Sequence, residues 1–405
     1  MLYLFGLDWS EEKHDVCIIT EDGRHLAAFS LDHDPQGLAR LEDVRKQLRA
    51  PASQCLVALE TAHNLVVDFL WAHHYTVYVI PPKAVNRYRD RHRQSRSQSD
   101  AGDAAVLAHL LRTDRYRYVP WQPDEPLTRQ IQALVRQIER LTRHERRFGS
   151  QLRALLLRYY PQALTLFSSL TSPISLAFIQ AYPTPQAAQA LSYDRFQAFC
   201  RQRHHTQPRK WPQIYARLQG PALTADPVVL EMYSEQARTL ASLALPLVQA
   251  LRRDLRRLEE LFNQHPDRDI FASLPGAGQL LAPALLAKFG DQRGRYPSPD
   301  IIQAIAGTCP VTIGSGKKRV VRFRRACDKE FRRIAQQFAM KSVQKSVWAA
   351  AYFQEVRPHC KSHSHAYRCL ANRWLAIIWK MWQDKKPYDE AYHLQQRAMR
   401  RRPRP

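Results

Sequence analysis

The sequence predicts an α/β domain at the N-terminus, a long helical middle region and a mostly helical domain at the C-terminus. Strand-like and helix-like segments alternate over residues 2–80, and apolar residues recur at helical spacing over residues 127–160 and again over 228–262. A third region with glycine-bounded helices begins near residue 269. We therefore place domains at residues 1–120, 121–265 and 266–390, followed by a basic tail at 391–405.

The N-terminal region starts with three strand-like segments and then alternates between helix and strand. The expected elements are strands at 4–7, 15–20 and 26–29 with a turn at 21–23, a helix at 35–48, a strand at 55–59, a helix at 66–73 and a strand at 76–80. This order indicates a ribonuclease H-like α/β layer fold.

Two long amphipathic segments bracket a proline-rich stretch in the middle region. The apolar positions at helical spacing are Ile131, Leu134, Val135, Ile138 and Leu141 in the first, and Leu251, Leu255, Leu258 and Leu261 in the second. This pattern suggests an antiparallel coiled-coil arm, which serves either dimerisation or packing within one chain.

The C-terminal region opens with the sequence Leu274-Pro275-Gly276-Ala277-Gly278, which predicts a hairpin before a helix that stops at Gly290. The element is similar to a helix-hairpin-helix, in which glycines such as Gly276 and Gly278 let backbone N–H groups approach a DNA phosphate closely. Pro-Gly turns before helices are also common without that role.

The charge balance indicates a polyanionic partner. Lys and Arg number 61 against 37 Asp and Glu, which gives a formal net charge of +24. Such a surface attracts nucleic-acid backbones, with anionic membranes as the competing partner. No apolar stretch approaches about 20 residues, so we expect neither a membrane span nor a signal peptide. Seven scattered cysteines without a C-x-x-C pair suit a reducing cytoplasm.

Four acidic residues stand where a metal-dependent nuclease needs them. Asp8 and Glu60 each close an apolar run, and Asp100 and Asp103 open a helix with i,i+3 spacing that puts both on one face. Gathering four like charges is costly unless cations compensate, and oxygen-only ligands favour Mg²⁺ or Mn²⁺. The alternative is that Asp100 caps its helix and Asp103 favours the helix dipole.

Five arginines precede this helix: Arg87, Arg89, Arg91, Arg93 and Arg96. Two interpretations are open. The segment is either a solvated loop or an arm that contacts phosphates beside the acidic residues.

A basic, glycine-rich loop is predicted from Gly307 to Arg319. Ser315 lies between two glycines, and the cations that follow it are Lys317, Lys318, Arg319, Arg322, Arg324 and Arg325. These cations can bind a phosphodiester, while a metal held by the carboxylates can activate the serine hydroxyl or stabilise a leaving oxygen. By itself, Gly-Ser-Gly is more often a flexible turn.

An ordered set of motifs carries a family resemblance. The set comprises Gly6-Leu7-Asp8, Leu59-Glu60-Thr61, Ser99-Asp100-Ala101-Gly102-Asp103-Ala104, the 274–278 hairpin, Tyr296-Pro297-Ser298, Ala306-Gly307 and Ser315-Gly316. Together these motifs resemble the DEDD (RuvC-like) transposases of bacterial insertion sequences of the 110 type, which are bridge-RNA-guided serine recombinases. The resemblance covers roughly residues 1–115 and 266–390.

The resemblance implies roles for matching residues. Asp8, Glu60, Asp100 and Asp103 would form the RuvC-like tetrad that binds Mg²⁺. Ser315, in a serine transposase domain, would form a transient phosphoserine link to DNA. A structured bridge RNA would select donor and target DNA by pairing, and the active site would combine both domains, across subunits of a homodimer or homotetramer.

Two positions depart from the family pattern. Gln98 stands where a lysine is frequent, and Ala326-Cys327-Asp328-Lys329 replaces a glycine-containing turn before the next helix. A structure-specific nuclease that uses the four acids alone, similar to a Holliday-junction resolvase, is therefore the alternative function. A non-catalytic nucleic-acid scaffold is the third.

Two further groups of residues are interpreted as structural. The spacing of His359, Cys360, His363, His365 and Cys369 fits no familiar zinc finger, so we do not predict a metal site there. Three tryptophans near helical spacing, Trp374, Trp379 and Trp382, are expected in the core, with stacking on an RNA base as the alternative. The tail 400–404 is expected to be disordered and to bind phosphate.

Overall fold

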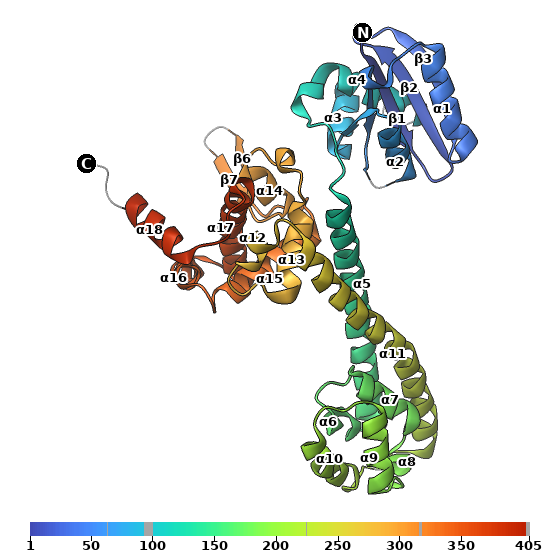
Figure 1. The fold of residues 1–405 in the computed structure, drawn as a ribbon, viewed down its shortest axis with the longest axis vertical. Coiled ribbons are helices and arrows are strands. Elements are labelled where there is room, and N and C mark those ends of the chain that lie inside the picture. The colour runs from blue at the N-terminus through green and yellow to red at the C-terminus, as the bar shows by residue number, and fades with distance from the viewer. Residues whose placement is uncertain (63, 93–99, 224, 316–317, 402–405) are drawn as a thin grey trace. The chain divides into compact units, whose positions relative to one another are not determined.

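The chain forms two compact units, Met1–Asp124 and Glu125–Pro405, in a computed structural model (Figure 1). All residues are described except 63, 93–99, 224, 316–317 and 402–405.

The first unit is built on a five-stranded sheet with strand order β3-β2-β1-β4-β5. Strands β1 to β3 form an antiparallel meander, whereas β4 and β5 continue the sheet parallel to β1. The elements are β1 (Tyr3–Trp9), β2 (Lys13–Thr20), β3 (His25–Asp32), α1 (Pro35–Gln47), β4 (Cys55–Leu59), α2 (Leu65–Ala72), β5 (Thr76–Val79), α3 (Pro82–His92) and α4 (Asp100–Asp114). The predicted order of strands and helices over residues 2–80 is confirmed.

Both faces of this sheet are covered, which explains why its central strands are continuous apolar runs. Side chains alternate along a strand, so Phe5 and Leu7 pack on the side of α1 and α2, whereas Leu4 packs on the side of α4. Gly6 is on the same side of the sheet as Leu4, and a Cβ atom built there would stand 1.8 Å from the Ala104 carbonyl oxygen of α4. The absence of a side chain at Gly6 therefore lets α4 lie directly on β1.

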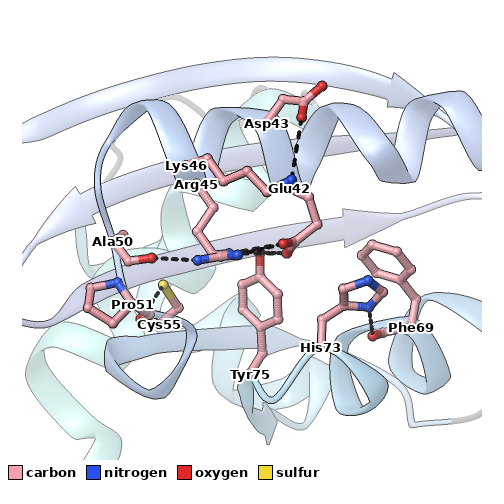
Figure 2. A network of polar contacts seen from close by, with 10 residues as sticks. All are labelled: Glu42, Asp43, Arg45, Lys46, Ala50, Pro51, Cys55, Phe69, His73 and Tyr75. Atoms are coloured by element: carbon pink, nitrogen blue, oxygen red, sulfur yellow. Dashed lines mark hydrogen bonds and ion pairs between the residues drawn. The ribbon is translucent and has the colours of Figure 1, made fainter.

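A buried polar network fastens α1 to the layer that contains β4 and α2 (Figure 2). Glu42 pairs with Arg45 at 2.7 Å and accepts a 2.5 Å hydrogen bond from the Tyr75 hydroxyl, while Arg45 donates to the Ala50 carbonyl. Burial alone raises the pKa of Glu42, but hydrogen bonds from Arg45 and Tyr75 leave the pKa below its usual value. The network thus satisfies a carboxylate that would otherwise be costly to bury.

The second unit is mostly helical. Its elements are α5 (Pro126–Tyr159), α6 (Ala163–Leu166), α7 (Pro173–Ala181), α8 (Pro185–Gln189), α9 (Tyr193–Gln202), α10 (Trp211–Leu218), α11 (Pro227–Gln264), α12 (Arg268–Ala272), α13 (Gly278–Phe289), α14 (Pro299–Ile305), β6 (Val311–Ser315), β7 (Lys318–Arg322), α15 (Lys329–Ser342), α16 (Val347–Val356), α17 (His363–Asp384) and α18 (Glu390–Arg401).

The long helices α5 and α11 are the two amphipathic segments predicted from the sequence, and they pack antiparallel. The start of α5, at Ile131 and Val135, shares a core with the end of α11, at Leu258. The end of α5, at Leu156, shares a second core with the start of α11, at Ala241. The proline-rich stretch between them folds into α6 to α10, because its prolines stand at the first turns of helices, where they are tolerated.

The core of the C-terminal region contains α13, α15 and α17. Trp374 and Trp382 are fully buried, which confirms their expected core position. The Trp374 indole donates a 2.8 Å hydrogen bond to the Ser342 hydroxyl. Replacing a tryptophan of this kind by alanine costs about 3–5 kcal/mol. Arg400 and Arg401 belong to α18, so the expectation of disorder is wrong for them, and 402–405 lie outside the described residues.

The predicted glycine hairpin joins α12 to α13. Gly276 has a φ of +81°, and a Cβ atom there would stand 2.9 Å from the Lys341 carbonyl oxygen, so glycine is required for two reasons. Helix α13 ends before Gly290, whose φ is 71°, as predicted. In the part of the chain that the structure describes, no helix has the length and apolar character needed to cross a membrane.

Candidate active site

Asp8 and Glu60 lie level with each other at the ends of β1 and β4. These strands pair in parallel with Gly6 opposite Ala58, so the same offset two residues further on brings Asp8 level with Glu60. Alternation along the strands puts both residues on the face that carries Leu4 and Ala58, which is the face covered by α4. Both side chains are half-buried.

Helix α4 supplies the other two acids. It starts at Asp100, whose side chain lies outside the described set, and Asp103 follows in its first turn. The close approach of Ala104 to Gly6 fixes this end of the helix beside β1. The prediction that Asp100 and Asp103 open a helix is therefore confirmed.

Arg89 of α3 forms an ion pair with Asp103, with 2.6 Å between the guanidinium and the carboxylate. The two side chains are only 11% and 20% exposed. Burial raises the pKa of Glu60, Asp103 raises it further, and Arg89 opposes the rise. Glu60, Asp103 and Arg89 thus interact electrostatically although they come from three different segments of the chain.

A fifth carboxylate, Asp15, lies beside this group and was missed in the sequence analysis. Asp15 is the direct cross-strand partner of Asp8 in the β1–β2 pair, and it accepts a 2.5 Å hydrogen bond from the Ser30 hydroxyl. Like charges directly opposite each other destabilise an antiparallel pair. Counting back from the predicted turn at 21–23 gives this register, so the signal was present in the sequence.

The donor set fits a hard divalent cation. All the acids offer oxygen ligands, Asp8 and Asp15 are direct cross-strand partners, and burial together with Asp103 raises the pKa of Glu60. The described carboxylates do not form a group of three ligand atoms within 4.8 Å of one another. Arg89 supplies one compensating positive charge at Asp103.

The arginine-rich segment is helical as far as it is described. Helix α3 spans Pro82–His92, so the loop interpretation is wrong for Arg87, Arg89 and Arg91, while Arg93 and Arg96 lie outside the described residues. Arg87 and Arg91 face solvent, and Arg89 turns toward Asp103. Gln98, which replaces a frequent lysine, also lies outside the described residues.

Ser315 lies in the second unit, at the end of a β-hairpin rather than in the predicted loop. Strands β6 and β7 pair antiparallel with Ser315 opposite Lys318, and their connection at 316–317 is outside the described residues, as are the side chains of Ser315 and Lys318. The hairpin exposes apolar side chains, with Ile313 at 47% and Val321 at 61%.

The chain that leaves this hairpin is basic. Arg319, Arg322 and Arg325 are exposed, whereas Arg324 donates a 3.4 Å hydrogen bond to the Cys309 carbonyl. Asp328, at the position of the expected glycine turn, caps α15 by accepting the Phe331 amide at 2.9 Å. The capping explains how the chain enters α15 without a glycine.

A groove of 720 Å³ in the second unit combines the glycine hairpin with cations. It is lined by Gly276 and Gln279 and by four basic side chains: Arg143, Arg146, Arg333 and Lys341. Glu139 also lines the groove and forms an ion pair with Arg333. The groove offers an anion several positive charges beside the hairpin predicted to approach phosphate.

Two family models and several known proteins match this chain. Residues 5–161 match the transposase model for DEDD proteins of IS110, and residues 268–354 match the transposase family IS116/IS110/IS902. The transposase named for the IS117 mini-circle of Streptomyces coelicolor is 32% identical over 401 residues, covering 95% of each chain. The 44.8 kDa protein of insertion element IS116 from Streptomyces clavuligerus is 25% identical, covering 97% of this chain and 98% of that protein. The 42 kDa protein of IS900 from Mycobacterium paratuberculosis is 24% identical, covering 95% of this chain and 97% of that protein.

Proposed function

Since this chain belongs to the DEDD transposases of the IS110 type and is therefore a DNA-binding transposase, we propose that it cuts and rejoins DNA strands through Ser315. A divalent cation, Mg²⁺ with Mn²⁺ as a substitute, assists at Asp8, Glu60, Asp100 and Asp103. The observation that carries the proposal is the convergence of β1, β4 and α4 on one half-buried set of mutually repelling carboxylates.

The architecture supports this assignment. An antiparallel meander followed by two parallel strands, in the order β3-β2-β1-β4-β5, is the order that a ribonuclease H-like (RuvC-like) domain requires. We assign that domain to residues 1–120, a coiled-coil arm to the antiparallel helices within 121–265, a serine transposase domain to 266–390 and a basic tail to 391–405. The element around Gly276 acts as a helix-hairpin-helix.

The acidic residues prepare the phosphodiester. When bound, the cation supplies positive charge that neutralises the phosphate. Asp103 must first be released from Arg89 before it can bind the cation. Burial and the nearby Asp103 raise the pKa of Glu60, so a bound cation would stabilise its ionised form. Asp8 and Glu60 are held in position by strands with no freedom to shift, because both faces of the sheet are packed.

Ser315 performs the exchange of strands. Its Oγ forms a bond to phosphorus while the bond from phosphorus to the departing strand oxygen breaks. The proton lost by the serine hydroxyl balances the proton gained by the departing oxygen. Attack by the hydroxyl of another strand reverses the step and frees the serine. The cations Lys317, Lys318 and Arg319 follow Ser315 directly and bind the phosphate.

A structured guide RNA selects the donor and target DNA. The net charge of +24 favours binding of nucleic-acid backbones, and basic side chains occur on α3, in the groove beside Gly276 and along the exit of the hairpin. The complete site is formed across subunits of a homodimer or homotetramer, so that one subunit contributes carboxylates and another contributes Ser315.

A trapped protein–DNA adduct tests the serine chemistry. Wild-type protein is incubated with guide RNA, DNA and Mg²⁺, quenched in denaturant and digested, and the DNA-linked peptide is sequenced by mass spectrometry. We expect a phosphodiester link at Ser315 and a loss of at least about 10³-fold in adduct and recombinant product for Ser315→Ala.

Thr312→Ala is the matched control, because Thr312 is an exposed hydroxyl residue on the same strand, β6. We expect that variant to keep adduct formation within about threefold of wild type. Cleavage that persists unchanged in Ser315→Ala would instead support the alternative function, a metal-dependent structure-specific nuclease that attacks DNA with water.

RNA that copurifies with the protein tests the guide. The expected result is one discrete species whose loops are complementary to donor and target DNA. The absence of such a species, in protein that still recombines DNA, contradicts the guide proposal and leaves the serine chemistry intact.

A further inference from the structure

Three metal-ligating side chains of the second unit meet at the start of α17. Cys360 follows the short helix η5 (Arg357–His359), whereas His365 and Cys369 lie four residues apart on α17 and so share one face. The two sulfur atoms and the imidazole nitrogen all lie within 4.8 Å of one another. In the described part of the chain, no other Cys, His or acidic side chains form such a group.

The backbone holds this arrangement in place. Ser362 caps α17 by accepting the His365 amide at 3.2 Å, and Arg357 donates a 3.1 Å hydrogen bond to the Cys360 carbonyl. The segment that joins Cys360 to the helix is therefore fixed at both ends. The spacing in the sequence matches no familiar zinc finger, but the fold brings the three ligands together.

The chemistry of the three ligands selects zinc. Two thiols and one imidazole are soft and borderline ligands, which suit Zn²⁺ and disfavour Mg²⁺. Zn–S bonds of about 2.3 Å and Zn–N bonds of about 2.0 Å place ligand atoms about 3.5–3.8 Å apart in a tetrahedron. The observed group reaches that geometry with shifts of about 1 Å or less, which side-chain rotation supplies.

The cluster is connected to the hairpin that carries Ser315. Arg368, beside Cys369, lies over the Phe323 ring at 4.6 Å, and Arg332 of α15 lies over the same ring at 4.6 Å. Arg332 also donates a 3.1 Å hydrogen bond to the Arg324 carbonyl. Phe323 follows β7 directly, so these two arginines hold the base of the β6–β7 hairpin.

We propose that Cys360, His365 and Cys369 bind a zinc ion, with water as the fourth ligand, and that this ion fixes the start of α17 and thereby the base of the Ser315 hairpin. The metal site itself does not depend on the proposed recombinase chemistry. Its role at the hairpin is measured here by backbone mobility rather than by activity.

Metal content of the full-length protein tests the site. Protein purified without chelators, under reducing conditions and supplemented with zinc, is dialysed and analysed by mass spectrometry. We expect about one zinc per chain in wild type and a loss of at least about tenfold in Cys369→Ser and His365→Ala. Cys360→Ser, which changes a residue outside the helix, gives the same loss without altering α17.

Cys309→Ser is the matched control, because Cys309 is a half-buried cysteine outside the cluster. It should keep its zinc, and cobalt substitution should give a thiolate charge-transfer band in wild type and Cys309→Ser only. Wild type without bound zinc, a Cys360–Cys369 disulfide in the reduced preparation, or equal loss in Cys309→Ser would each overturn the site.

Hydrogen exchange tests the anchoring of the hairpin. Stripping zinc from wild type should accelerate amide exchange in β6 and β7 by at least about tenfold while leaving the buried strand β1 unchanged. Unchanged exchange in the hairpin after zinc removal would overturn the anchoring role.

Discussion

The carboxylate region and the serine hairpin are held by the protein in opposite ways. Asp8 and Glu60 extend from strands whose residues are almost completely buried, in a sheet covered on both faces. Ser315 ends a strand in a two-stranded sheet, where Ile313 and Val321 are about half exposed. A hairpin of two strands has little stability of its own.

The difference indicates how the two halves work. The carboxylates gain precision from packing, and the protein tolerates their repulsion because the sheet cannot relax. At the base of the hairpin, Arg332 and Arg368 lie over the Phe323 ring and Arg324 donates to the Cys309 carbonyl, whereas Ile313 and Val321 on its strands are exposed. Changes near β1 should therefore destabilise the protein, whereas changes at the tip of the hairpin should not.

The largest expected effect is that of adding a side chain to Gly6. A Cβ atom there would overlap the backbone of α4, so Gly6→Ala should destabilise the first unit by about 3–5 kcal/mol. Gly314→Ala is the matched change in the hairpin, because a Cβ atom there meets no described atom within 4 Å. It should change stability by less than about 0.5 kcal/mol.

Urea unfolding measured by hydrogen exchange in each unit compares the two variants. Equal stability of the Gly6→Ala and Gly314→Ala proteins would contradict the contrast between a packed scaffold and an open hairpin.

A smaller effect is expected from Arg89. Its guanidinium pairs with a carboxylate oxygen of Asp103, which we propose as a ligand of the cation, so Arg89→Gln should lower the Mg²⁺ concentration for half-maximal adduct formation by about three- to tenfold. Lys46→Gln, which removes an exposed cation of α1 in the same unit, is the control and should leave that concentration unchanged. A Mg²⁺ dependence that is identical in wild type and Arg89→Gln would show that Arg89 does not compete with the metal.

The smallest expected effects are on the pH dependence of stability. Replacing Glu60 and replacing Glu42 should change the melting temperature in opposite directions. The pKa of Glu60 is raised, so its ionised form costs stability at neutral pH, and the cost disappears as pH falls through that raised pKa. Metal-free Glu60→Gln should melt about 2 °C higher than wild type at pH 7, with no gain below pH 4.5.

Glu42 should behave in the opposite way. Its pKa is lowered, so its ionised form adds stability above the ordinary value of 4.5, and this stability is lost as pH falls through the lowered pKa. Glu42→Gln should cost about 1–2 kcal/mol at pH 7, because the bonds to Arg45 and Tyr75 lose their charge. Melting temperatures of Glu60→Gln and Glu42→Gln, measured from pH 3 to 8, test both predictions. Changes of the same sign in the two variants at pH 7 would contradict the pKa directions.

The sequence predicted the elements that have buried faces. The strands ending at Asp8 and Glu60 are continuous apolar runs, and α5 and α11 have apolar residues at helical spacing, so each is recognisable locally. The positions of the four acidic residues could be predicted together with these elements, because the acids lie at the ends of the strands and at the start of α4.

Elements without a buried face were missed. In the described part of α3, Val85 is the fully buried residue. One buried apolar position gives no helical spacing, so the helix around Arg87 could not be predicted from the sequence. Most described side chains of the β6–β7 hairpin are exposed, and its Gly-Ser-Gly sequence indicates a loop. The Cys360 group combines a cysteine that precedes α17 with His365 and Cys369 on one face of that helix. The i,i+4 spacing of His365 and Cys369 is visible in the sequence, but the approach of Cys360 to them is not.

The yield of the serine–DNA adduct in Asp8→Asn tests most directly the claim that the carboxylates and Ser315 act on the same phosphodiester. Glu12→Gln, an exposed acid in the β1–β2 connection, is the control. We predict that Asp8→Asn loses at least about 10²-fold in adduct at saturating Mg²⁺ while still binding guide RNA, and that Glu12→Gln keeps its full yield. A full yield of adduct at Ser315 in Asp8→Asn would contradict the account.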